Sequence, residues 1–165
     1  MRQILLVRHA IAMEPHDFAG PDSGRPLTEE GISRMKKGAR GLQKILGKWD
    51  AIASSPYLRA QQTAEILSTE FPGVKSFTWE QMAPGASAAK LCRHFNEHSQ
   101  YSKIAFVGHQ PSLGFFVSEL LAGEGASFYA FKKGGAVLLE FSGPAEPGTS
   151  RLIWALNPSE LRALG

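Results

Sequence analysis

Basic side chains follow three of the apolar runs in the sequence. Arg8 and His9 come directly after the run ILLV, with no polar residue between. His109 follows the run KIAFVG, and Arg59 lies shortly after the run AIASS. Brought together without a nearby carboxylate, these groups would repel one another unless a polyanion lay between them. A phosphoryl group is such an anion, because guanidinium groups bind its oxygens bidentately and an imidazole adds a further donor.

An imidazole in this setting can do chemistry as well as bind. Arginine neighbours and a position at a strand end keep one imidazole neutral at physiological pH, which leaves a nitrogen lone pair for attack on phosphorus. A neutral imidazole can therefore form a covalent phosphoryl intermediate. The remaining cations would stabilise the charge that spreads over the equatorial oxygens during transfer. This chemistry requires neither a metal ion nor a cofactor, and we expect none.

The predicted elements explain how distant residues could share one site. Apolar runs and turn residues predict strands over residues 4–7, 51–55, 73–78 and 103–107, with a late strand pair over 135–141 and 151–156. Helical spacing predicts helices over 29–46, 57–71, 88–95 and 111–123, and a short final helix. Alternating strands and helices are typical of an α/β fold, here a three-layer αβα sandwich whose central sheet is mostly parallel with one antiparallel strand. Ligands bind at the carboxyl ends of parallel strands, where the basic groups then meet.

A long loop separates the first strand from the first helix. It runs from about Met13 to Leu27 and is rich in Pro, Gly and Asp. Loops of this length without secondary structure are uncommon, so we expect it to border a site. Thr28 is the predicted N-cap of the helix that follows, and Ser87 the predicted cap of a later one.

Length and composition favour one domain spanning residues 1–165. The 165 residues are 43% hydrophobic and 20% charged, as in a globular domain with a sizeable core. The apolar runs are too short for a membrane span or a signal peptide, so we expect a cytoplasmic protein without a membrane partner. The net charge of +3 is spread along the chain among acidic residues, which predicts no nucleic-acid partner. Cys92 is the only cysteine, which excludes an intrachain disulfide.

Four ordered motifs resemble those of the histidine phosphatase superfamily. They are LVRH at 6–9, RPLTEEG at 25–31, SSPYLRAQQTA at 54–64 and GH at 108–109. The spacing, the short chain and the RPLTEEG segment are most similar to the small phosphohistidine phosphatase branch, the SixA type. The resemblance implies a phosphoglycerate mutase-like fold and a single histidine phosphatase domain over residues 1–165.

The resemblance also implies a role for each matching residue. His9 would be the nucleophile that becomes transiently phosphorylated. Arg8, Arg59 and His109 would form the phosphate pocket, and His109 would also stabilise the transition state. Arg25, in the RPLT segment, is similar to a rim residue that reaches the phosphate or the incoming protein.

Two positions differ from the family pattern or match it weakly. Ala10 stands where the family usually has glycine after Arg-His, and because alanine is the smallest possible change we expect the pocket to be retained. Glu80 falls where many members carry a catalytic glutamate, so it is the candidate general acid. For a phosphohistidine substrate, the protonated nitrogen leaving group would need little help from Glu80.

The resulting prediction is a metal-independent phosphatase that acts through phospho-His9. Its expected substrate is phosphohistidine in a protein, such as a histidine phosphotransfer domain of a signalling relay. The main alternative is a small-molecule phosphomonoesterase of the same superfamily, acting on a small phosphate ester. Such relatives often carry an inserted helical lid, whereas Arg59 and His109 lie only 50 positions apart. We therefore expect an open pocket that suits a side chain on a protein. A third alternative is a module that binds phosphoryl groups without turnover.

Two further patterns suggest other chemistry. His94, Glu97 and His98 fit the H-x-x-E-H pattern of one zinc protease class, but no third ligand segment is evident, so we expect a solvated helix face. The loop of cysteine phosphatases needs an arginine six positions after the cysteine, and His98 occupies that position after Cys92. We therefore expect the thiol to pack in the core.

Overall fold

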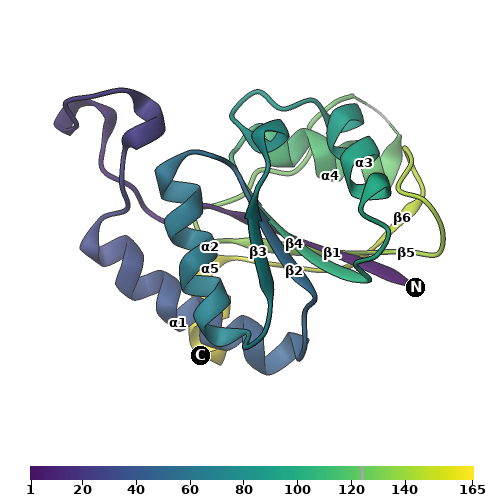
Figure 1. The fold of residues 1–165 in the computed structure, drawn as a ribbon, viewed down its shortest axis with the longest axis horizontal. Coiled ribbons are helices and arrows are strands. Elements are labelled where there is room, and N and C mark those ends of the chain that lie inside the picture. The colour runs from purple at the N-terminus through teal and green to yellow at the C-terminus, as the bar shows by residue number, and fades with distance from the viewer. Residues whose placement is uncertain (124) are drawn as a thin grey trace.

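One mixed sheet forms the centre of the molecule. The computed structural model describes residues 1–123 and 125–165, and within them six strands pair in the order β3-β2-β4-β1-β5-β6 (Figure 1). Their bounds are β1 Arg2–Arg8, β2 Ala51–Ser54, β3 Lys75–Thr78, β4 Lys103–Gly108, β5 Ala136–Phe141 and β6 Ser150–Leu156. Strands β3, β2, β4 and β1 run parallel, whereas β5 runs antiparallel to both of its neighbours. The predicted α/β sheet with one antiparallel strand is confirmed.

Helices cover both faces of this sheet. The helices are α1 Glu29–Leu46, α2 Leu58–Glu70, α3 Ala88–Glu97, α4 Ser112–Ala122 and α5 Pro158–Leu164. One buried cluster joins the sheet to α1, α2 and α5, and a second joins it to α3 and α4. The two helical layers lie on opposite sides of the strands in Figure 1. This is the predicted three-layer sandwich.

The central strand β1 explains the long apolar run at the start of the sequence. Ile4 and Leu6 contribute to one buried cluster, whereas Leu5 and Val7 contribute to the other. Because successive side chains of a strand point to opposite faces, a strand between two helical layers needs apolar residues at every position. The strand that presents Arg8 is therefore held from both sides.

Local sequence accounts for several helix ends. The Thr28 hydroxyl accepts the backbone N–H of Gly31 at 2.9 Å, and the Ser87 hydroxyl accepts that of Lys90 at 3.2 Å. Both predicted N-caps are confirmed. The predicted strand at 73–78 begins later, at Lys75, because Gly73 has a φ of +81°, which a strand does not allow.

The long loop between β1 and α1 contains two short 3₁₀ helices, η1 Pro15–Asp17 and η2 Asp22–Gly24. Its two ends are joined at the base, where Ala12 pairs with Leu27 and the Met13 N–H donates to Pro26 O at 2.9 Å. The loop projects beyond the carboxyl ends of the strands, at the upper left of Figure 1. Elsewhere, η3 Glu80–Met82 follows β3. Across the two described ranges, no helix has the length and apolar character needed to cross a membrane.

Candidate active site

The backbone around His9 is fixed by strand-like hydrogen bonds beyond the end of β1. The His9 N–H donates to Gly108 O at 3.0 Å, and the Arg8 N–H donates to Gly135 O at 3.1 Å. The Gly134 N–H lies 3.1 Å from both the Arg8 and the His9 carbonyl oxygens. Residues from two separate segments, at Gly108 and at Gly134 and Gly135, therefore hold the two positions after the buried run.

The structure brings His9, Arg59 and His109 together. Arg59 Nε donates to His9 Nε2 at 3.3 Å, and the ring centroids of His9 and His109 are 5.2 Å apart. Their exposed fractions are only 6%, 5% and 3%. The absence of an inserted lid had predicted an open pocket, but in this structure the two imidazoles are largely covered. The predicted meeting of basic groups at the carboxyl edge of the sheet is nevertheless present.

Arg8 belongs to the same cluster. Its Nη1 donates to Phe131 O at 2.6 Å, and its Nε is buried without a hydrogen-bond partner among the described residues. Burial lowers the pKa of Arg8, and the charge of Arg59 acts in the same direction. The Arg8 Nε–H is therefore a hydrogen-bond donor in the cluster for which the described chain provides no acceptor.

The environment of His9 fixes both its charge and its tautomer. Burial lowers its pKa to about 4, and the charges of Arg59 and Arg8 add to this effect, although the Ala10 carbonyl opposes it. His9 is therefore neutral at pH 7. Its Nδ1 lies 2.8 Å from Ala10 O, which places the ring proton on Nδ1 and leaves the lone pair on Nε2. That lone pair accepts the Arg59 Nε–H in this structure.

His109 is also neutral at pH 7. Burial, followed by the charges of His9 and Arg59, lowers its pKa to about 3. Its Nε2 lies 2.7 Å from the hydroxyl of the fully buried Ser55, whereas its Nδ1 has no partner in the described part of the chain. Ser55 thereby fixes the orientation of the ring.

A carboxylate that the sequence did not predict lies against the cluster. Asp22 Oδ2 is 3.1 Å from Arg59 Nη2, and Asp22 O accepts Arg59 Nη1 at 2.9 Å. The basic groups are therefore not without a nearby carboxylate, and Asp22 balances part of their charge. The one sequence feature that could have indicated it was the length of the loop that carries Asp22.

Arg25 reaches the cluster through Asp22. Its Nε lies 2.8 Å from Asp22 Oδ1, and its Nη1 donates to the Met13 carbonyl. This hydrogen bond from Arg25 is the largest cause of a lowered pKa at Asp22, which is ionised at pH 7. Arg25 thus lies beside the pocket, as expected for a rim residue, but its partner here is the protein's own carboxylate.

Thr63 joins the segment after His9 to helix α2. Its hydroxyl accepts the Ala10 N–H at 3.0 Å and donates to Arg59 O at 2.7 Å. Within the described chain, positive φ angles occur only at glycines, so Ala10 carries no backbone strain. Ala10 therefore lacks the positive φ that would require glycine at this position.

Glu80 is not brought into the cluster. It is exposed at the start of η3, and in the described ranges no hydrogen bond or ion pair joins it to His9, Arg59 or His109. Its predicted role as general acid thus has no support from the contacts of this structure.

The His94 and His98 pair is packed rather than solvated, which corrects the sequence-based expectation. Both imidazoles contact Trp79, with ring centroids 4.0 and 4.6 Å from the indole. His98 Nδ1 lies 2.8 Å from His94 O, and no group of three or more potential metal ligands occurs among the residues described. Cys92 is buried, as predicted, and burial raises its pKa to about 11, so it is a protonated core thiol.

Together, the fold and the cluster define an α/β protein with an imidazole and guanidinium site at the carboxyl edge of its sheet. Comparison with known proteins identifies the family. Residues 4–83 match the model of the histidine phosphatase superfamily (branch 1). An uncharacterized protein of Picosynechococcus is 37% identical over 139 residues, covering 82% of each chain. The chain belongs to the histidine phosphatase superfamily.

Relatives of full length place it with the SixA type. Phosphohistidine phosphatase SixA of Escherichia coli is 26% identical over 166 residues, covering 97% of this chain and 96% of SixA. A solved structure of the protein histidine phosphatase SixA with tungstate has a TM-score of 0.83 at 23% identity, covering 96% and 99% of the two chains. A phosphoserine phosphatase of Entamoeba histolytica shares the fold, with a TM-score of 0.74, 17% identity and coverage of 98% and 100%. The chain is accordingly a phosphatase that acts on phosphorylated substrates.

Proposed function

We propose that this phosphatase removes the phosphoryl group from phosphohistidine in a protein, through a phosphohistidine intermediate on His9. The observation that carries the proposal is the state of the His9 imidazole. It is neutral, its Nδ1 proton is held by Ala10 O, and its Nε2 lone pair lies beside the Arg59 guanidinium. A neutral imidazole of fixed tautomer next to a cationic oxyanion site is suited to nucleophilic attack on phosphorus.

In the first step, the His9 Nε2 lone pair forms a bond to phosphorus. The bond from phosphorus to the nitrogen of the substrate imidazole breaks, and its electron pair stays with that nitrogen. Before this step the Arg59 Nε–H must exchange its acceptor, from His9 Nε2 to a phosphoryl oxygen, which frees the lone pair. Arg8 and Arg59 then share the negative charge of the transferring group.

In the second step, water attacks the phosphorus of phospho-His9. The bond to Nε2 breaks, its electron pair returns to the His9 ring, and inorganic phosphate leaves. His109, held by Ser55, keeps Nδ1 available for a phosphoryl oxygen in both steps. The proposal requires no metal ion, since the nucleophile and the charge stabilisation both come from side chains.

The substrate class is supported by the position of Glu80. The oxygen leaving group of a phosphomonoester needs a proton from a general acid, whereas an already protonated imidazole leaves without one. Glu80 is exposed, and in the described chain no hydrogen bond or ion pair joins it to the cluster. Similarity to phosphohistidine phosphatase SixA supports the same choice. We therefore propose a phosphorylated protein, such as a histidine phosphotransfer domain, as the substrate and partner.

A phosphomonoester is the second candidate substrate. The Asp22 carboxyl group lies against Arg59 and is a candidate general acid for a leaving oxygen, but its lowered pKa leaves it ionised at pH 7 and without a proton to donate. Comparing kcat/KM for a phosphohistidine protein with that for a panel of small phosphate esters distinguishes the two. We expect the phosphohistidine protein to have the higher kcat/KM.

The intermediate is tested by rapid quenching with a ³²P-labelled phosphohistidine protein. We expect enzyme-bound label that is lost in acid and stable in alkali, as for a phosphorus–nitrogen bond. His9→Ala should abolish both trapping and turnover, whereas the control His16→Ala, in the exposed part of the long loop, should retain both. Turnover by His9→Ala, or label that survives acid and is lost in alkali, would contradict the proposal. Activity should also be unchanged by a metal chelator.

A further inference from the structure

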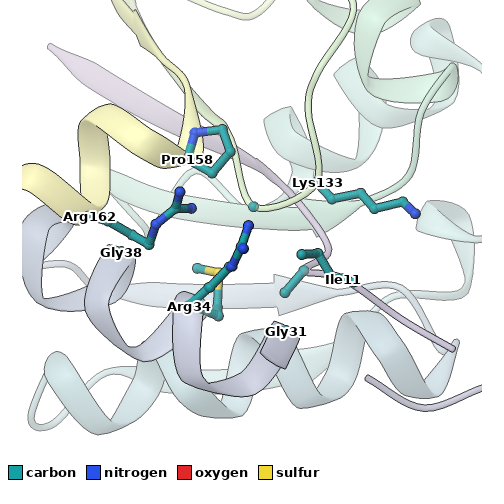
Figure 2. Close-up of a pocket in the computed structure, with 10 residues that line it drawn as sticks. Ile11, Gly31, Arg34, Gly38, Lys133, Pro158 and Arg162 are labelled. Carbon is teal, nitrogen blue, oxygen red and sulfur yellow. The ribbon is translucent and has the colours of Figure 1, made fainter. Parts of the chain in front are cut away.

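A second pocket lies behind the segment that follows His9. Figure 2 shows it between helices α1 and α5, with Ile11 on one side, and Ala10 is also among the residues that line it. Its lining residues are Ala10, Ile11, Gly31, Arg34, Met35, Gly38, Lys133, Gly134, Pro158 and Arg162. The first step of catalysis uses none of its charged side chains.

Glycines in the wall of the pocket let the surrounding backbone segments approach one another closely. At Gly31, a Cβ atom would lie 2.0 Å from Ile11 O, so only glycine allows α1 to approach the chain after His9. Gly134 has a φ of +81°, and the chain turns there above Pro158. The enclosed volume is about 20 Å³, room for roughly one water molecule or one oxygen of a larger group.

Three cations line this pocket, and none of its described lining residues is acidic. In Figure 2, the guanidinium groups of Arg34 and Arg162 extend over the pocket from α1 and α5, whereas Lys133 points outward along the chain from its rim. Arg34 pairs with Glu30, one turn earlier, where both side chains are about half exposed. In the described chain, no hydrogen bond or ion pair engages the side chain of Arg162. Exposed ion pairs are weak, so both guanidinium groups can accept another anion.

We propose that this pocket is a second oxyanion-binding site, in which Arg34 and Arg162 bind a phosphate or carboxylate group. The small enclosed volume allows one oxygen to enter, while the rest of the anion stays at the mouth between the two guanidinium groups. Arginine suits this arrangement because its planar donors bind two oxygens of one group.

The position of the pocket relates it to the active site. Ala10 forms part of its wall, and the Ala10 carbonyl holds the Nδ1 proton of His9. Lys133, at the rim, lies close enough to His9 for its charge to lower the pKa of that imidazole. The anion can therefore be a free phosphate ion or an acidic side chain of the protein whose phosphoryl group lies at His9. Both anions present oxygen atoms to the two guanidinium groups, and they differ only in whether those oxygens belong to a phosphate ion or to a carboxylate of the substrate protein.

The site is tested by titrating the ¹⁵N-labelled protein with inorganic phosphate and observing the arginine Nε–H resonances. We expect saturable shifts at Arg34 and Arg162, with a binding curve separate from that of Arg59. Arg162→Gln should weaken binding at Arg34 about tenfold, the loss expected for one charge-assisted hydrogen bond, and leave the Arg59 curve unchanged. Arg93→Gln removes the same charge from α3 on the opposite face and should change neither curve.

Unmoved Arg34 and Arg162 resonances at phosphate concentrations that saturate Arg59 would overturn the proposal. So would an Arg34 curve that Arg162→Gln does not weaken. The titration detects binding and not turnover, so its result is independent of the proposed phosphohistidine chemistry.

Steady-state kinetics then identify the source of the anion. If it is a carboxylate of the substrate protein, Arg162→Gln raises the ratio of KM for the phosphorylated protein to KM for a small phosphate ester by about tenfold. If it is free phosphate, the ratio stays at the wild-type value while the resonance shifts persist. A raised or an unchanged KM ratio, together with saturable shifts of the Arg34 and Arg162 resonances, supports the second anion site.

Discussion

Burial, more than any neighbouring charge, keeps the His9 imidazole neutral. The two arginines contribute in the same direction, and the Ala10 carbonyl contributes against it. Removing the ring from water disfavours the charged form, so the nucleophile does not have to lose a proton before it attacks. The same covering that makes His9 neutral also limits how a substrate can approach it.

The first prediction concerns the pH at which this ring becomes charged. Imidazole ¹⁵N spectra should show His9 taking up its proton near pH 4, since burial disfavours the charged form. The folded-state pKa of about 4 lies below the ordinary imidazole value of 6.5, so between pH 4 and 6.5 the unfolded chain binds more protons than the folded chain. The free energy of unfolding should thus fall as the pH is lowered from 6.5 towards 4, and His9→Asn should reduce this fall. A His9 titration near pH 6.5 would show that the ring is solvated.

The Asp22 carboxylate binds Arg59 Nη2, a hydrogen-bond donor that the proposed phosphoryl group would also use. An ionised carboxylate at this place repels a phosphate, so Asp22→Asn should lower the inhibition constant of inorganic phosphate by about tenfold. Asp17→Asn removes the same charge from the same loop, where the carboxylate pairs with His16, and should leave the constant unchanged. Weaker inhibition in Asp22→Asn would instead mean that Asp22 holds Arg59 in its binding position.

Thr63 is a positioning residue for the segment that follows His9. Thr63→Val leaves the buried Ala10 N–H without its acceptor, which should cost about 1–3 kcal/mol of unfolding free energy. It also releases the Ala10 carbonyl that orients His9, so kcat should fall more than KM changes. Thr63→Ser keeps the hydroxyl and should restore kcat. Equal kcat for Thr63→Val and wild type would assign Thr63 to stability alone.

Helix α1 contains one glycine whose position has no room for a side chain, Gly31, and one whose position has room for a methyl group, Gly38. At Gly31 a Cβ would lie 2.0 Å from the backbone oxygen of Ile11, whereas at Gly38 its nearest neighbour would be Leu161 Cβ at 3.8 Å. The first position requires glycine so that the helix can pack against the chain after His9. The second has room for a methyl group.

The matched substitutions test this contrast. Gly31→Ala should lower the free energy of unfolding by about 1–3 kcal/mol or more through overpacking. Gly38→Ala should raise it by about 1 kcal/mol, because alanine is the better helix former. Urea unfolding followed by circular dichroism measures both. A stabilising Gly31→Ala would show that the close approach of α1 to Ile11 is absent in solution.

The two buried clusters of the molecule share one sheet. Successive residues of β1 belong to alternate clusters, so neither helical layer can detach without exposing the apolar face of a central strand. We propose that residues 1–165 form a single cooperative domain. Each cluster contains its own tryptophan, which makes the proposal measurable.

Trp79 lies in the cluster under α3 and α4, and Trp49 lies in the cluster under α1 and α2, against which Trp154 also packs. Trp79→Phe and the double variant Trp49→Phe/Trp154→Phe therefore report unfolding of opposite faces. We expect each variant to show one urea midpoint by fluorescence that coincides with its midpoint by circular dichroism. Separate midpoints would divide the chain into two units.

The sequence by itself determined the α/β fold and the meeting of Arg8, His9, Arg59 and His109. These follow from local patterns, namely apolar runs, helix caps and the rule that parallel strands end at one edge of a sheet. The one antiparallel strand was predictable for the same reason, because the late strand pair has no helix between its members.

Only the tertiary structure decided which atoms of these residues meet. Asp22 and Arg59 are 37 positions apart, and nothing local to either residue indicates their contact. The same holds for the hydrogen bond between Thr63 and Ala10, and for the position of Arg34 and Arg162 in the lining of one pocket. The proton position on His9 depends on burial and on one carbonyl oxygen, which exist only after the two helical layers have closed over the sheet. Long-range packing thus turned a predicted cluster of basic residues into a neutral nucleophile with a defined lone pair.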